Sequence, residues 1–208
     1  MTNTPEYSNR TLDKFKSKLV GGGARPNLFE CEIAFPDGLD VVSDEDFNFM
    51  VKAASLPASN INVINIPFRG RNLKVAGDRT FDPWTITVIN DTNFKIRNAF
   101  EKWMNFINRH DDAAGVITPG AYQVNMKVFQ LGRGDVADGT RGTLPGRGET
   151  IPVLKAYKFY GVFPTAISAI ELSYDNADAI EEFTVDLQVQ WWDAASTDST
   201  SIFGVESF

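Results

Sequence analysis

Cysteine and histidine are almost absent from this sequence, which has one of each among its 208 residues. A single cysteine cannot form an intrachain disulfide, and we interpret Cys31 as a buried, inert side chain on one strand face with Phe29 and Ile33. A zinc site needs several histidine or cysteine ligands, so one of each cannot complete it. His110 is the one histidine that could act as a general base, and no GxSxG motif supplies a nucleophilic serine. The sequence therefore predicts no cofactor, no metal site and no enzyme activity.

Long apolar runs are also missing, since none approaches the roughly 20 residues of a membrane-spanning helix. The first 18 residues are polar and lack the apolar centre of a signal peptide, so we expect a cytoplasm-like compartment. Excess positive charge is absent too: the formal net charge is -7 and the pI is about 4.8. Ordinary nucleic-acid binding depends on Lys and Arg, so this charge argues against it. Acidic clusters at 44–46 and 181–182 are interpreted as solvated surface.

Aromatic residues are abundant, with 16 Phe and 4 Trp, and the sequence is 43% hydrophobic. Such a composition suits one β-rich domain with an ample core. Alternating apolar and polar residues predict strands, and residues 182–192 show this alternation most clearly. The strands are expected at 28–35, 47–54, 61–68, 84–90, 122–131, 151–160, 167–173 and 182–192.

One amphipathic helix is predicted at 92–108, with Asp91 as its N-cap. The sequence between strands 61–68 and 84–90 is interpreted as connecting turns, at 69–71 and at 76–80. Seven or eight strands and one helix indicate a mainly β fold, an antiparallel barrel or sandwich.

The domain boundaries follow composition. Residues 1–23 form a polar N-terminal arm, in which Leu12, Phe15 and Leu19 have the spacing of a short docking helix. The β-barrel domain is expected at 24–193 and includes an exposed insertion, rich in Gly and Arg, at 132–149. Residues 194–208 form a polar C-terminal tail.

Several segments together resemble the tail tube proteins of contractile-tailed bacteriophages. Residues 75–91, reading VAGDRTFDPWTITVIND, are similar to the central signature of that family. Residues 24–30 (ARPNLFE) resemble its entry into the first strand, and 161–165 (GVFPT) with 183–192 resemble its closing strands. The similarity extends over about 24–193, and the arm, the insertion and the tail depart from it.

The resemblance implies a subunit that forms hexameric rings, which stack into an inner tube within a contractile sheath. The implied partners are other copies of the chain, the sheath protein, and the baseplate and tail terminator proteins. Genomic DNA would pass through the lumen without specific binding during genome ejection. The implied location is the tail of the virion, after assembly in the host cytoplasm.

The resemblance implies that each subunit contributes four strands to the barrel that lines the channel. In this sequence we expect those strands at 47–54, 61–68, 122–131 and 151–160. The polar residues expected on these strands at the lumen are Asn48, Lys52, Asn62, Asn65, Gln123 and Asn125. The residues expected at subunit interfaces are Asp78, Arg79, Arg69 and Arg71.

Other functions remain open from the sequence. The same fold serves the tubes of extracellular contractile injection systems and, more distantly, of type VI secretion systems. A baseplate protein that initiates the tube would form a single ring and no filament. An enzyme, from a different class, would have to depend on His110.

Overall fold

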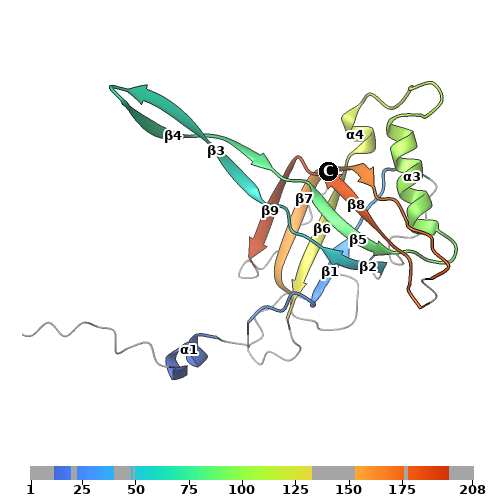
Figure 1. The fold of residues 1–208 in the computed structure, drawn as a ribbon, viewed down its shortest axis with the longest axis horizontal. Helices are drawn as coiled ribbons and strands as arrows, with labels where there is room; N and C mark the ends of the chain where they lie inside the picture. Colours follow the sequence, from blue (N-terminus) through green and yellow to red (C-terminus); the bar gives the residue numbers. More distant parts are fainter. Residues whose placement is uncertain are drawn as a thin grey trace, which may run out of the picture. The chain divides into compact units, whose positions relative to one another are not determined.

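A computed structural model describes residues 12–19, 23–39, 48, 50–132, 153–175 and 178–196. The helices are α1 (Leu12–Lys18), α3 (Lys95–Ile107) and α4 (Pro119–Tyr122). The strands are β1 (Phe29–Glu32), β2 (Val51–Ala54), β3 (Ser59–Phe68), β4 (Arg71–Phe81), β5 (Trp84–Ile89), β6 (Val124–Leu131), β7 (Val153–Ile167), β8 (Glu182–Gln188) and β9 (Trp191–Ser196). The predicted mainly β fold with one long amphipathic helix is therefore confirmed (Figure 1).

Seven strands form one sheet in the order β1-β6-β7-β8-β5-β2, and β9 also pairs with β7. β5 and β8 are antiparallel along their whole length, with Trp84 opposite Leu187 and Val88 opposite Phe183. In both strands every second side chain is buried, because successive side chains point to opposite faces of a sheet. The alternation that predicted these two strands is confirmed.

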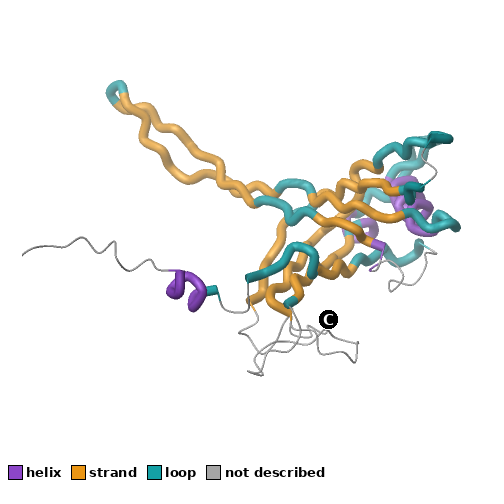
Figure 2. Tube along the Cα trace, turned by 60° about the horizontal axis from the view of Figure 1, so that its bottom comes forward, coloured by secondary structure: helices purple, strands orange, loops and turns teal. Residues whose placement is uncertain are grey.

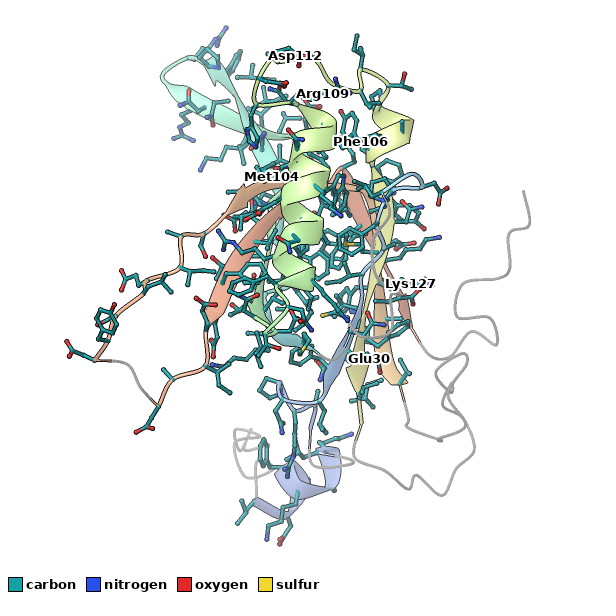
Figure 3. All side chains as sticks on the ribbon, turned by 90° about the vertical axis from the view of Figure 1, so that its right-hand side faces the viewer. Glu30, Met104, Phe106, Arg109, Asp112 and Lys127 are labelled. Atoms are coloured by element: carbon teal, nitrogen blue, oxygen red, sulfur yellow. The ribbon has the colours of Figure 1, made fainter. Side chains whose placement is uncertain are left out.

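Helix α3 contributes its apolar stripe to the core, where Ile96, Ala99, Phe100 and Trp103 are buried. Figure 3 shows the helix lying over the strands, with a layer of side chains between them. The ring of Phe35 meets the rings of Phe100 and Trp103 edge-on, each at 5.5 Å between centroids. These edge-to-face contacts are a favourable geometry for aromatic pairs. The helix is therefore a structural cover of the core.

The chain divides into two compact units, and the second consists of residues 30–128 and 157–195. The first unit has its own small core, in which Phe129, Leu131, Val153 and Ala156 pack with Leu28. Gln130 stabilises this core, since its side-chain Nε2 donates to the Leu28 carbonyl at 2.7 Å. Each unit thus buries apolar side chains of its own.

Several sequence predictions need correction. Residues 76–80 are not a turn but belong to strand β4. Residues 168–173 lie beyond the end of β7 and form no strand, and the predicted strand 182–192 is two strands, β8 and β9. Helix α3 begins at Lys95 because Phe94 has a positive φ of 53°. Asp91 still accepts a hydrogen bond from the Lys95 amide at 2.8 Å.

Other predictions fall partly outside the described residues. Helix α1 confirms the short helix expected from Leu12, Phe15 and Leu19. The insertion at 132–149 lies outside the described residues after Gly132, and so does the tail after Ser196. None of the helices in the described segments is long and apolar enough to cross a membrane.

Two buried tryptophans provide a matched test of the core. Trp103 Nε1 donates to the Tyr122 carbonyl at 2.9 Å, whereas Trp84 Nε1 has no hydrogen-bond partner among the described residues. Trp103→Phe and Trp84→Phe remove similar volume, but only the first leaves a carbonyl without its donor. We expect Trp103→Phe to lower the free energy of unfolding by about 1 kcal/mol more than Trp84→Phe. Urea unfolding of the unassembled protein measures both, and equal losses would contradict the role of this hydrogen bond.

Cys31 provides a pH test. Its side chain is fully buried, and that burial, with a smaller effect of the Glu30 charge, raises the pKa of its thiol to about 12. In the unfolded chain the thiol ionises near pH 8.5, so above that pH the unfolded state loses a proton that the folded state keeps. The contribution of Cys31 to stability is therefore complete below about pH 8.5 and declines as the pH rises toward 12.

We expect the wild-type free energy of unfolding to fall relative to that of Cys31→Ala, by about 1 kcal/mol per pH unit above pH 9. Urea titrations of both proteins between about pH 7 and 11 measure the difference. A constant difference over this range would contradict the raised pKa.

Candidate assembly surface

Strands β3 and β4 form a two-stranded sheet separate from the larger one. β3 is rich in β-branched residues, which favour extended backbone. Arg69 and Gly70 connect the strands, and both have positive φ values, 45° and 82°. Two-residue turns of this kind match the right-handed twist of a hairpin. The result is a long hairpin, which Figure 2 shows as two strands with a loop at the tip.

A bulge interrupts the hairpin. Ile61 pairs with Arg79 and Val63 with Ala76, so β4 carries one extra residue at this point. Gly77 occupies the bulge, and a Cβ atom there would lie 3.0 Å from the Asn62 carbonyl oxygen and 3.1 Å from Ile64. Glycine fits this close backbone approach, which also changes which face the β4 side chains occupy.

Beyond the bulge the hairpin has one apolar face. Ile64 is paired with Val75, Ile66 with Leu73, and Phe68 with Arg71. The opposite face presents Asn65 opposite Lys74 and Pro67 opposite Asn72. We call the first surface the apolar hairpin face, and its members are Ile64, Ile66, Phe68, Leu73 and Val75.

The apolar hairpin face is open to solvent in the single chain, with its members between 42% and 66% exposed. Every residue of β3 is exposed, and β4 is buried in part only at Gly77 and Phe81. An isolated two-stranded hairpin is marginally stable in water, because it cannot bury its own apolar side chains. A contiguous exposed apolar surface of this kind is typical of an interaction site.

Charge gives this surface a further property. The hairpin carries four cationic residues, Arg69, Arg71, Lys74 and Arg79, against one acidic residue, Asp78. The whole chain, in contrast, has a net charge of -7. The hairpin is therefore electrostatically complementary to the remainder of another copy of the same chain.

The four residues predicted at subunit interfaces all lie on this hairpin. Arg69 is at the tip, with its guanidinium 5.4 Å from the centre of the Phe68 ring. Arg71 pairs with Phe68, while Asp78 and Arg79 follow the bulge. Within the described segments neither Asp78 nor Arg79 forms an ion pair in its own chain. Their role between subunits stays a prediction.

The six residues predicted at the lumen occupy several places in one subunit. Asn62 lies at the bulge, and Asn65 lies on the polar face of the hairpin. Asn48 accepts a hydrogen bond from the Ile33 amide at 3.2 Å, and Lys52 forms an ion pair with Glu182.

Gln123 and Asn125 both approach Gly161, whose φ is 61°. Asn125 accepts a hydrogen bond from the Gly161 amide at 3.3 Å. The side chains of Asn48, Lys52 and Asn125 therefore already have structural partners, and the position of all six at the lumen stays a prediction.

Strand β4 was missed by the sequence analysis, although a signal for it exists. Leu73 and Val75 alternate with Asn72 and Lys74 immediately after the turn at Arg69 and Gly70. Gly77 and Asp78 have the composition of a turn, and a bulge uses the same residue types. The hairpin therefore looked like two connecting turns.

Metal binding and catalysis would depend on other residues. No group of three or more potential metal ligands occurs within the described ranges. His110 is exposed in the loop after α3, where its amide donates to Asn105 Oδ1 at 3.3 Å. The nearby pair of Arg109 and Asp112, 3.9 Å apart, is an exposed surface interaction (Figure 3).

The fold is similar to proteins of contractile injection machines. The sheath–tube complex of an extracellular contractile injection system (PVC, extended state) contains a chain that matches with a TM-score of 0.51 and 12% identity, covering 86% of this chain and 97% of that one. A chain of the tube-terminating cap of the anti-feeding prophage matches with a TM-score of 0.54 and 15% identity, covering 84% and 91%. At these identities the likeness defines the fold class alone.

Relatives found by sequence share a higher identity with this chain than these solved structures do. The tail tube protein gp19 of Enterobacteria phage T4 is 31% identical over 173 residues, which is 83% of this chain and 93% of that protein. The tail tube protein of Serratia phage KSP90 is 24% identical over 181 residues, 86% of this chain and 93% of that protein. The chain belongs to the phage tail tube protein family, whose model matches residues 24–195. The resemblance noted in the sequence is thereby confirmed.

Charge reversal at Arg79 tests the hairpin as an interface. Because Arg79 is exposed, we expect Arg79→Glu to change the free energy of unfolding of the unassembled chain by less than about 0.5 kcal/mol. Tube formation should be lost, since the reversed charge would face an acidic neighbour. Arg79→Lys is the control and should assemble. Circular dichroism and electron microscopy measure the two effects, and normal tubes from Arg79→Glu would exclude an interface role.

Proposed function

We propose that this chain assembles into hexameric rings that stack as the inner tube of a contractile phage tail. The observation that carries the proposal is the apolar hairpin face, which a single subunit leaves exposed. A neighbouring subunit would bury this face and so convert a marginal hairpin into a stable one. The membership of residues 24–195 in the tail tube family supports the same assembly.

The type of contact follows from the asymmetry of the subunit. The hairpin is basic and apolar, and the remainder of the chain is acidic, so the two surfaces that meet are different. Heterologous contacts of this kind close into rings or continue as filaments. Both outcomes are needed in a tube, with closure within a ring and continuation between rings.

The sheath protein, the baseplate and the tail terminator are the expected partners of such a tube. Fold relatives of this chain occur in a sheath–tube complex, in a baseplate and in a tube-terminating cap. Genomic DNA would pass through the lumen. A net charge of -7 per subunit disfavours tight contact with phosphates, because protein–DNA affinity depends on Lys and Arg contacts.

Two variants with new hydroxyl groups on opposite faces of the hairpin test the proposal. Ile66→Thr with Leu73→Thr places two hydroxyl groups on the apolar hairpin face, whereas Val63→Thr makes a similar change on the opposite face. All three side chains are exposed, so the unassembled chains should keep their fold. We expect the double variant to raise the concentration needed for assembly at least about tenfold, and Val63→Thr to assemble almost normally.

Light scattering measures the assembly concentration, and negative-stain images show whether rings or tubes form. Normal assembly of the double variant would contradict the use of the apolar hairpin face. A wild-type chain that stays monomeric well above micromolar concentrations would overturn the proposed function itself.

A further inference from the structure

Helix α1 lies outside the family match, which begins at residue 24. It has seven residues, and a helix this short is marginal in water unless its apolar side packs against something. Leu12, Phe15 and Leu19 lie on one side of the helix at positions i, i+3 and i+7. Their side chains are 67%, 63% and 46% exposed in the described structure.

Lysines border the apolar stripe of α1. At 100° per residue, Lys16 falls on one side of the stripe and Lys18 on the other. Both lie in the last helical turn, and neither has an acidic partner among the described residues. A surface that fits this helix must therefore combine apolar side chains with acidic residues at their edges.

The loop between β7 and β8 has that combination. It surrounds an open hollow of about 810 Å³, lined by residues 169–174 and 179–182. Leu172 and Ile180 are 85% and 72% exposed, and Tyr174 is fully exposed. Glu171, Asp175 and Asp178 alternate with these apolar residues and have no cationic partner in the described part of the chain.

The two ends of this loop are fixed. Ser168 donates its amide hydrogen to the Thr184 carbonyl, and its Oγ accepts from the Thr184 amide, both at 2.8 Å. At the other end, the backbone amide of Asn90 donates to the Glu181 carbonyl at 2.9 Å. The Asn90 side-chain Nδ2 donates to the Glu181 carboxylate at 2.7 Å. The loop that lines the hollow is thus anchored at both of its ends, before the start of β8.

We infer that α1 of one subunit docks into the β7–β8 hollow of a neighbouring copy, with its apolar stripe on Leu172, Tyr174 and Ile180. Lys16 and Lys18 then face the acidic residues of the loop. The inference rests on the proposed function, because assembly brings the second copy within reach. Residues 19–24 precede the turn in which the Leu28 amide bonds to the Arg25 carbonyl, and they span about 20 Å when extended, which sets the reach of α1 from that turn. The helix would act as a strap that adds to the hairpin contacts.

Disulfide trapping between two different single-cysteine chains tests the docking. One chain carries Phe15→Cys and the other carries Tyr174→Cys, both in the Cys31→Ala background. A disulfide-linked dimer from the mixture must join two copies. We expect this dimer under mild oxidation in the mixture, and much less of it from either chain alone.

Charge exchange makes the test specific. Lys16→Glu with Lys18→Glu in the first chain should lower the dimer yield about fivefold or more, through like-charge repulsion. Glu171→Lys with Asp178→Lys in the second chain should restore it. Failure of the exchanged pair to recover any yield would overturn the inferred contact.

Two further outcomes would also overturn it. A chain that carries both cysteines and closes only within itself would show that α1 covers its own loop. Tubes that form normally in the mixture without the dimer would show that α1 does not occupy the hollow in the assembled tube. Electron micrographs of the same samples separate these results from failure of the proposed function, which would appear as the absence of tubes from the wild-type chain.

Discussion

The antiparallel pairing of β5 with β8 is the interaction on which the rest of the second unit depends. Residues almost a hundred positions apart meet along this pair, and their inward side chains, from Trp84 to Phe183, form the centre of the core. Asn90 and Glu181 close one end of the pair, where the chain leaves for α3. At the other end, three residues before Trp84, the hairpin finishes at Phe81. A rigid strand pair thus places both the helix that covers the core and the hairpin that reaches outward.

Folding and assembly draw on different parts of the sequence. The buried residues of β5, β8 and α3 hold the subunit together and are fully removed from water. The apolar residues of β3 and β4 do little for the isolated chain, because they remain exposed. Their free energy of burial becomes available only when another subunit covers them. In the proposed assembly, this part of the hydrophobic content serves contacts between copies.

Much of the fold could be predicted from residue patterns. β5, β8 and α3 bury one side each, so their periodicities of two and 3.6 were visible in the sequence. The hairpin was harder, because the bulge at Gly77 shifts the alternation of β4 and resembles a turn in composition. The break between β8 and β9 was missed because Val189 and Trp191 continue the alternation of β8 across it.

Residue roles were less predictable than strands. The four residues predicted at subunit interfaces are exposed, as charged residues beside a turn usually are, although strand β4 holds three of them in place of the predicted turns. Their interface role stays a prediction. The six residues predicted at the lumen lie in several places of the subunit, and the sequence could not predict this. No sequence pattern indicates which polar side chain accepts a hydrogen bond from the backbone amide of a distant residue. Asn48 on Ile33 and Asn125 on Gly161 are such cases.

The arginines and lysine of the hairpin have a consequence for the unassembled protein. An exposed β-hairpin with an apolar face is a template for irregular aggregation through its free edges. Arg69 lies at the tip, Arg71 lies on the apolar face opposite Phe68, and Lys74 lies on the polar face, so two hairpins that approach each other meet like charges. Gatekeeper residues of this type suppress self-association of apolar strands without preventing contact with a surface of opposite charge. In the proposed assembly these cations would therefore disfavour pairing between exposed hairpins before another subunit covers the apolar face.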